Sequence, residues 1–234
     1  MNSILPPIAA VLPHSLTYHG DERIDPYYWL RDDTRSDPAV LDYLQAENGY
    51  TEAMLRPTEA LQKTLYQEMV DRQLPDDSSV PYYLKGYWYR SRYLPEQEYP
   101  LYERLAARPD APTELLLDGN QRAGDSDFYN LGALEISPSN HWMACSEDYV
   151  SRRQYQIRVR NLQTGDWLPD LVENTSGDVV WSADSAGFFY VRLDSETLLP
   201  YQVYYHSLGA EPAQDRLVYE EADNTYYLHI SHSR

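Results

Sequence analysis

Two similar stretches of alternating apolar and polar residues, 134–168 and 180–218, lie in the second half of the chain, offset by about 45 residues. Each contains a short apolar run of strand length, 142–145 in the first and 188–191 in the second, preceded by turn residues. These runs indicate inner strands of a sheet. A repeat of this period, built from short strands, is typical of a propeller blade.

An alternating strand follows each apolar run, at 156–160 in the first copy and 202–206 in the second. This alternation predicts half-exposed antiparallel strands, each ending at a turn. Even spacing of strands also occurs in β-sandwiches. Periodicity therefore favours a propeller and leaves the sandwich as the alternative.

The first 75 residues follow a helical pattern after a proline-rich arm that extends to about His19. Ser36 or Asp37, with Pro38 just after it, predicts a helix start. Pro57 interrupts this helix, and a second amphipathic helix follows with Leu61 and Leu65 on one face. The polar stretch 74–79 ends the helical period. We therefore expect a helical extension over 1–75 and a β domain over 76–234.

The β domain is expected to begin at Val80, with a hairpin that turns at Lys85 and Gly86. Further strands are predicted at 99–105 and 114–117, a second unit at 128–168, a third at 179–219 and the beginning of another strand at 226–230. The fold class is thus mainly β, with about three blades of a propeller. Propellers close with four to eight blades, so the pattern predicts a part of something longer.

Charge and composition limit the kinds of molecule that the chain is expected to bind. The formal net charge is −18, and the acidic residues are spread along the chain. A negative field of this kind argues against nucleic acid and anionic membranes as partners and favours cationic peptides. An acidic surface also keeps a protein soluble without any partner, which is the simpler interpretation. The one cysteine, Cys145, cannot form an internal disulfide, and no twenty-residue apolar segment occurs. A cytoplasmic protein is the expectation.

Several separated motifs together resemble one family. They are His19-Gly20, the stretches 25–33 and 41–48, Ser151-Arg152-Arg153-Gln154-Tyr155, and the stretch 198–203. In this order they closely resemble the amino-terminal part of oligopeptidase B in the prolyl oligopeptidase family of serine peptidases (S9A). The resemblance implies a seven-bladed propeller over an α/β-hydrolase domain. It also implies that the helical extension packs on that hydrolase domain, and that short peptides are cleaved after Arg or Lys.

The chain departs from this family where the chemistry should be. A serine nucleophile in such a domain needs a Gly-x-Ser-x-Gly elbow, and no such motif occurs in the 234 residues. In the family, that domain follows the propeller. We therefore predict no catalytic, cofactor-binding or metal-binding residue in this chain, and no activity of the chain alone.

Local constellations give weak alternatives. His229 and His232 would face opposite sides of a strand, which disfavours a metal site. His141 lies near Cys145 in the sequence, but the segment is typical of blade core and turn rather than of a thiol nucleophile. The acidic pairs Asp32-Asp33 and Asp76-Asp77 are expected to be solvated charges in loops.

Three hypotheses remain for the chain as a whole. It is the propeller portion of a serine oligopeptidase that is inactive alone and acts as a gate, or a free-standing binding module, or a subunit completed by a separate hydrolase chain. The first implies short cationic peptides and the missing carboxy-terminal hydrolase domain as partners.

Overall fold

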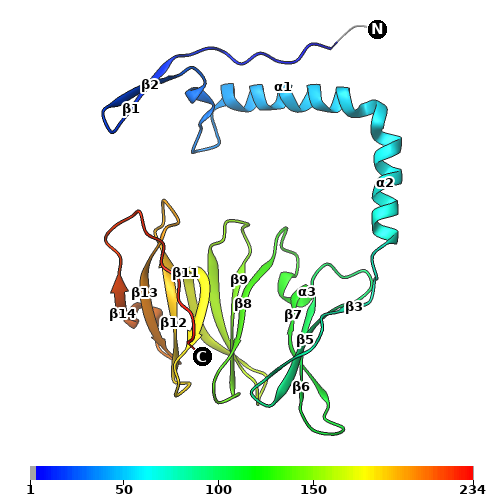
Figure 1. Cartoon of the computed structure of the whole chain (residues 1–234), viewed down its shortest axis with the longest axis vertical. Coiled ribbons are helices and arrows are strands. Elements are labelled where there is room, and N and C mark those ends of the chain that lie inside the picture. Colours follow the sequence, from blue (N-terminus) through cyan, green and yellow to red (C-terminus); the bar gives the residue numbers. More distant parts are fainter. Residues whose placement is uncertain (1–3, 234) are drawn as a thin grey trace. The chain divides into compact units, whose positions relative to one another are not determined.

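The computed structural model describes residues 4–233, and these fall into two compact units (Figure 1). The first unit ends at Leu74 and the second begins at Pro75. None of the helices in residues 4–233 combines the length and the apolarity that crossing a bilayer requires.

The first unit opens with a hairpin of β1 (His14–Tyr18) and β2 (Asp21–Asp25), which pair in antiparallel fashion. An extended arm was expected up to about His19; residues 14–18 are extended, and their pairing with 21–25 was not predicted. His19 and Gly20 both have positive φ, 54° and 83°, as a two-residue hairpin turn between right-twisted strands requires. The Trp29 indole N–H donates to the Ala10 carbonyl at 2.8 Å and holds the preceding chain in place.

Two helices follow, separated by a bend. Helix α1 (Pro38–Leu55) begins after Asp37, whose carboxylate accepts from the Ala39 N–H at 2.8 Å, so the predicted start is confirmed. Pro57 lies in the 3₁₀ turn η2 (Arg56–Thr58), after which α2 (Glu59–Asp71) begins in a new direction (Figure 1).

The helices of the first unit have little core of their own. Val40 is the only buried residue described in this unit. Apolar side chains along both helices are exposed, including Leu44 at 49% and Leu65 at 46%. An amphipathic helix is stable when its apolar face is covered, so these faces lack the surface that their sequence pattern implies.

The second unit consists of antiparallel strands in three successive groups, which we call blades 1, 2 and 3 (Figure 1). Blade 1 is the sheet β3 (Asp77–Ser78), β4 (Tyr82–Leu84), β5 (Tyr87–Tyr93), β6 (Leu101–Ala106) and β7 (Thr113–Asp118). Blade 2 contains β8 (Asn130–Ile136), β9 (Trp142–Asp148), β10 (Tyr155–Asn161) and the first part of β11 (Trp167–Trp181). Blade 3 contains the last part of β11, β12 (Gly187–Leu193), β13 (Pro200–Ser207) and β14 (Arg216–Glu220).

Most predicted strands are confirmed. The hairpin β4–β5 turns at Lys85 and Gly86, whose φ values of 47° and 88° fit a two-residue turn. The apolar runs 142–145 and 188–191 lie in β9 and β12, each of which pairs with a strand on both sides. Three short elements of the second unit were not predicted: β3, which pairs with β5 before Val80, helix α3 (Gly119–Ala123), which Asp118 caps, and the 3₁₀ turn η3 (Pro212–Gln214).

A strand was expected at 226–230, and the structure has none there. The Leu228 N–H donates to the Pro200 carbonyl at 3.1 Å, but no ladder forms along this segment. A strand needs a row of backbone hydrogen bonds to a neighbouring strand, and this segment has one such bond to β13.

Strand β11 joins blades 2 and 3 because it belongs to both. Thr175 pairs with Tyr155 of β10 on one side and with Arg192 of β12 on the other. Asn174 and Gly177 have positive φ, 57° and 96°, and the register with β12 shifts between Thr175 and Val179. The strand therefore bends where it leaves one blade and enters the next.

The blades pack on one another through two apolar clusters. Ala144 of β9 contacts the cluster that contains Trp181 and Phe188 of blade 3. Its neighbours Met143 and Cys145 belong to a second cluster, with Leu116 and Leu117 of blade 1 among its members. Since successive side chains of a strand point to opposite faces, β9 buries both of its faces, one against each neighbouring blade.

Substitution of Gly177 tests whether the bend of β11 depends on a glycine at this position. A Cβ at this position would lie 2.8 Å from Cδ2 of Tyr155, in addition to the strain of a positive φ. Gly86 has a similar φ of 88° but open space around it. We expect Gly177→Ala to lower the free energy of unfolding by at least about 1 kcal/mol more than Gly86→Ala, the scale of overpacking in a core.

Urea unfolding of the two glycine variants, followed by circular dichroism, measures this difference. Equal losses of stability in the two variants would show that the Tyr155 ring moves aside easily. The close approach of Gly177 to this ring would then not determine the bend of β11.

Candidate functional site

A concave feature with a mixed polar and apolar lining lies in the second unit, with a volume of about 660 Å³. We call it the inner groove. Its wall is formed by Leu84 and Lys85 of the β4–β5 turn, Ala133, Glu135 and Ile136 of β8, Pro138, Asp178, Val179, Val180 and Trp181 of β11, Ala183, and the segment His229, Ile230, Ser231 and His232. It thus takes side chains from all three blades and from the end of the chain.

Charged groups line this groove between apolar ones. The Lys85 ammonium donates to the Ile136 carbonyl at 3.1 Å and closes blade 1 against blade 2. Burial raises the pKa of Glu135, while the charges of Lys85 and His232 act in the opposite direction. Asp178 accepts from the Ser176 hydroxyl at 3.2 Å and keeps 32% of its side chain exposed.

The structure brings His229 and His232 to the same groove, although sequence reasoning placed them on opposite sides of a strand. His229 Nδ1 lies 3.1 Å from Asp178 Oδ2. The reason for the difference is that the segment is irregular, so the alternation of a strand does not apply to it. Within residues 4–233, no group of three or more His, Cys, Asp or Glu side chains has a geometry that could hold a metal ion.

The other residues considered as site candidates from the sequence are either far from a partner for catalysis or engaged in structural hydrogen bonds. Cys145 is fully buried, and burial raises the pKa of its thiol, which disfavours the reactive thiolate, while His141 is exposed in the preceding turn. Asp32 accepts from the N–H groups of Asp37 and Ser36 and from the Thr34 hydroxyl. These hydrogen bonds, that of Asp37 first, lower its pKa to about 2, so it organises the turn before α1.

Asp76 likewise has a structural partner. Its two carboxylate oxygens accept from Nε and Nη2 of Arg92 at 3.0 and 2.9 Å. This bidentate pair accounts for the lowered pKa of Asp76. The pair links the start of the second unit to β5.

A buried imidazole between two carboxylates lies in blade 3. Nδ1 of His206 is 2.7 Å from Asp215, and Nε2 is 3.1 Å from Asp170, with all three side chains at most 1% exposed. The Tyr190 hydroxyl donates to Asp215 at 2.9 Å. Both ring nitrogens are occupied by carboxylates and water has no access, so this cluster lacks the free base and the nucleophile that acyl transfer requires.

A second buried pair ties α3 to β9. Arg122 donates from Nε and Nη2 to the two oxygens of Glu147 at 2.7 and 2.6 Å, and the Glu147 side chain is fully buried. The Tyr129 hydroxyl also donates to Glu147, at 3.1 Å. The hydrogen bonds to Glu147 are the first cause of the raised pKa of Arg122. The guanidinium also lies over the Trp167 ring, 4.6 Å from its centroid.

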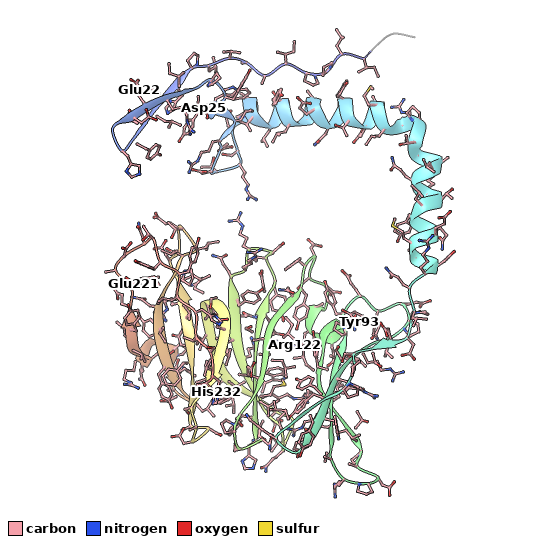
Figure 2. All side chains as sticks on the ribbon, viewed as in Figure 1. Glu22, Asp25, Tyr93, Arg122, Glu221 and His232 are labelled. Atoms are coloured by element: carbon pink, nitrogen blue, oxygen red, sulfur yellow. The ribbon has the colours of Figure 1, made fainter. Side chains whose placement is uncertain are left out.

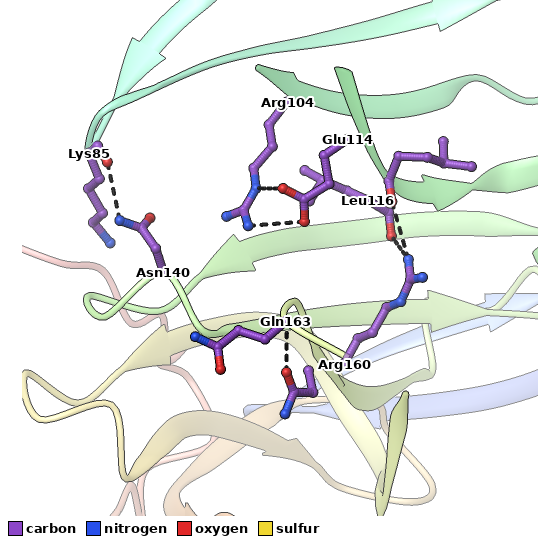
Figure 3. A network of polar contacts seen from close by, with 9 residues as sticks. Lys85, Arg104, Glu114, Leu116, Asn140, Arg160 and Gln163 are labelled. Carbon is purple, nitrogen blue, oxygen red and sulfur yellow. Dashed lines mark hydrogen bonds and ion pairs between the residues drawn. The ribbon is translucent and has the colours of Figure 1, made fainter. Parts of the chain in front are cut away.

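Polar contacts also cross from blade 1 to blade 2, as Figure 3 shows. Arg160 Nη1 donates to the Leu116 carbonyl at 2.6 Å, and the Asn140 side-chain amide donates to the Lys85 carbonyl at 3.2 Å. Within blade 1, Arg104 forms a bidentate pair with Glu114. Sequence reasoning missed these partners because no local pattern pairs residues that are far apart in the chain.

Blades 2 and 3 share a strand, blades 1 and 2 pack face to face, and the three described blades do not close into a ring. This arrangement defines a β-propeller that is incomplete within this chain. Comparison with known proteins agrees, because the family described as "Prolyl oligopeptidase, N-terminal beta-propeller domain" matches residues 6–234. The chain belongs to the prolyl oligopeptidase family, of which it carries the amino-terminal propeller part. The fold class predicted from the sequence is confirmed, and the β-sandwich alternative is excluded.

Individual relatives give the extent of this likeness. The chain is 43% identical to "Dipeptidyl aminopeptidase BI" of Pseudoxanthomonas mexicana over 99% of its length, and 34% identical to "Protease 2" of Moraxella lacunata over 97%. It superposes on the structure of oligopeptidase B from Leishmania major with a TM-score of 0.84 at 32% identity, covering 94% of this chain. The chain spans 34% of the first two relatives and 33% of the third.

The structural role of the buried group His206, Asp170 and Asp215, the His206 cluster, can be tested by substitution. We expect His206→Ala to lower the free energy of unfolding by about 3–5 kcal/mol, because it leaves two carboxylates buried without their partner. His141→Ala, at an exposed position, serves as the matched control and should change it by less than about 0.5 kcal/mol. Thermal and urea unfolding report both values. A loss below 1 kcal/mol for His206→Ala would contradict this assignment, since an uncompensated buried charge costs more than about that amount.

Proposed function

We propose that this chain is the propeller portion of a serine-type oligopeptidase that cleaves short peptides after Arg or Lys, and that the chain alone is inactive. The observation that carries the proposal is the family match over residues 6–234 together with the lack of any Gly-x-Ser-x-Gly in the sequence. A hydrolase domain that follows the propeller supplies the triad in this proposal, and a cytoplasmic location is proposed with it.

The role of the chain in this proposal is to control access. A propeller over a catalytic domain limits entry to short or unfolded peptides. The formal charge of −18 supports attraction of cationic substrates, because a field of one sign raises the local concentration of oppositely charged molecules.

The first unit has a second role in the proposal, as a cover for the hydrolase domain. Its helices carry exposed apolar side chains and bury only Val40. A helix face of this kind is stabilised when another surface covers it.

Peptidase activity of the native protein tests the first part of the proposal. An antibody to the exposed loop residues Ser195, Glu196 and Thr197 captures the product from its source, and the captured material and the 234-residue chain are assayed separately. The substrates are blocked fluorogenic peptides that differ only in an Arg, Lys, Pro or Ala before the scissile bond. We expect the captured product to prefer Arg and Lys by more than about tenfold in kcat/KM, and the chain alone to show no hydrolysis.

Each part of this proposal has its own contrary result. Hydrolysis by the chain alone would contradict its inactivity, and a preference for Pro would contradict the proposed specificity. A captured product without peptidase activity would overturn the proposed function.

Leu65→Glu tests the proposed cover. In the isolated chain Leu65 is 46% exposed, so we expect little change in the midpoint of thermal unfolding. In the same chain joined to the hydrolase domain of Protease 2 from Moraxella lacunata, we expect a loss of about 2 kcal/mol, the scale of burying one leucine side chain.

Lys63→Glu is the matched control, because Lys63 lies on the same helix but off the apolar face. It should leave both the isolated and the joined protein unchanged. Equal effects of Leu65→Glu in the two proteins would show that this face covers nothing on the hydrolase domain.

A further inference from the structure

The inner groove has the chemistry of a peptide site. Glu135 of β8 and Asp178 of β11 place two carboxylates on its wall, and Ile136, Val179 and Trp181 provide apolar surface beside them. The one lysine of the wall, Lys85, is engaged with the Ile136 carbonyl at 3.1 Å. Two carboxylates against one engaged ammonium favour a cationic group in the groove and repel an anionic one.

One wall of this groove is an irregular segment of the chain. The segment from His229 to His232 forms part of the groove lining and has no regular secondary structure. One basic side chain lies against a wall carboxylate, because the His229 imidazole is 3.1 Å from Asp178 Oδ2. His232, labelled in Figure 2, belongs to the same lining as Glu135. The wall carboxylate of Asp178 is therefore already within reach of a basic side chain, that of His229.

The segment is held by few contacts of its own. Leu228 makes a backbone hydrogen bond to Pro200, while the His229 side chain is 71% exposed. An ion pair or hydrogen bond with this exposure contributes little to stability, so a peptide with a stronger cation can compete for the same carboxylate.

We propose that the inner groove binds a short peptide through a basic side chain, which Asp178 and Glu135 receive, while Ile136, Val179 and Trp181 contact its aliphatic stem. An arginine suits the site because its guanidinium donates to carboxylates at fixed angles and its stem packs on apolar surface. This deepens the proposed function, on which it rests, by placing recognition of basic peptides in the propeller as well.

Fluorescence anisotropy with the 234-residue chain tests the site without any catalytic step. The probe is a fluorescein-labelled, blocked alanine peptide with one central arginine, and the matched probe has citrulline, which is neutral and of nearly equal shape, in place of the arginine. We expect the arginine peptide to bind about tenfold more tightly, as a charged hydrogen bond in a partly desolvated site provides.

Variants locate the binding. Asp178→Asn and Glu135→Gln should each weaken binding of the arginine peptide by about fivefold to tenfold and leave the citrulline peptide unchanged. Glu173→Gln is the matched control, since Glu173 is an exposed carboxylate on the same strand as Asp178 but outside the groove lining. His229→Ala should strengthen binding, because it removes the side chain that occupies Asp178. Unfolding midpoints equal to that of the wild type establish that each variant is folded.

Three results would overturn the groove site. They are equal affinities for the arginine and citrulline peptides, an equal effect of Glu173→Gln and Asp178→Asn, and an unchanged affinity in His229→Ala. The first indicates no charge recognition, the second a diffuse effect of net charge, and the third a site elsewhere on the chain. None of them bears on peptidase activity of the native product, so failure of this inference is distinguishable from failure of the proposed function.

Discussion

The structure of the second unit depends on one constraint: a blade with two apolar faces needs a neighbour on each. Strand β9 shows this directly, because Ala144 packs toward blade 3 while Met143 and Cys145 pack toward blade 1. Blade 2 is consequently the best-buried part of the unit, whereas β14 at the free edge is exposed along its whole length. The stability of each blade is therefore a property of the row rather than of the blade alone.

Buried polar side chains also hold the second unit together, at positions where no backbone ladder joins the two elements. The Arg122–Glu147 pair fastens α3 to β9, and the His206 cluster fastens β13 to β11 and to the segment before β14. Each buried charge has a partner with good geometry, which is the condition for keeping it in a dry interior. These clusters contain residue types that also occur in catalytic sites, but burial and mutual pairing give them a structural role.

Two surfaces of the chain are open to other molecules. The family match places it in the amino-terminal propeller part of prolyl oligopeptidases, and it spans about a third of the length of its relatives. Two surfaces remain without a complete partner in the described residues: the apolar faces of α1 and α2, and the inner groove with Glu135 and Asp178. The first surface is apolar, and the second combines two carboxylates with apolar side chains.

The sequence by itself determined the local structure. Asp37 and Pro38 mark the start of α1, Lys85 and Gly86 form a hairpin turn, and the repeat of about 45 residues identifies blades, because caps, turns and alternation depend on neighbours along the chain. The motifs also identified the family. Only the tertiary structure decided which distant residues meet: His206 with Asp170, 36 residues away, or His229 with Asp178, 51 residues away. It also decided that β11 serves two blades and that 226–230 forms no strand, because pairing depends on which strands the packed row brings alongside one another.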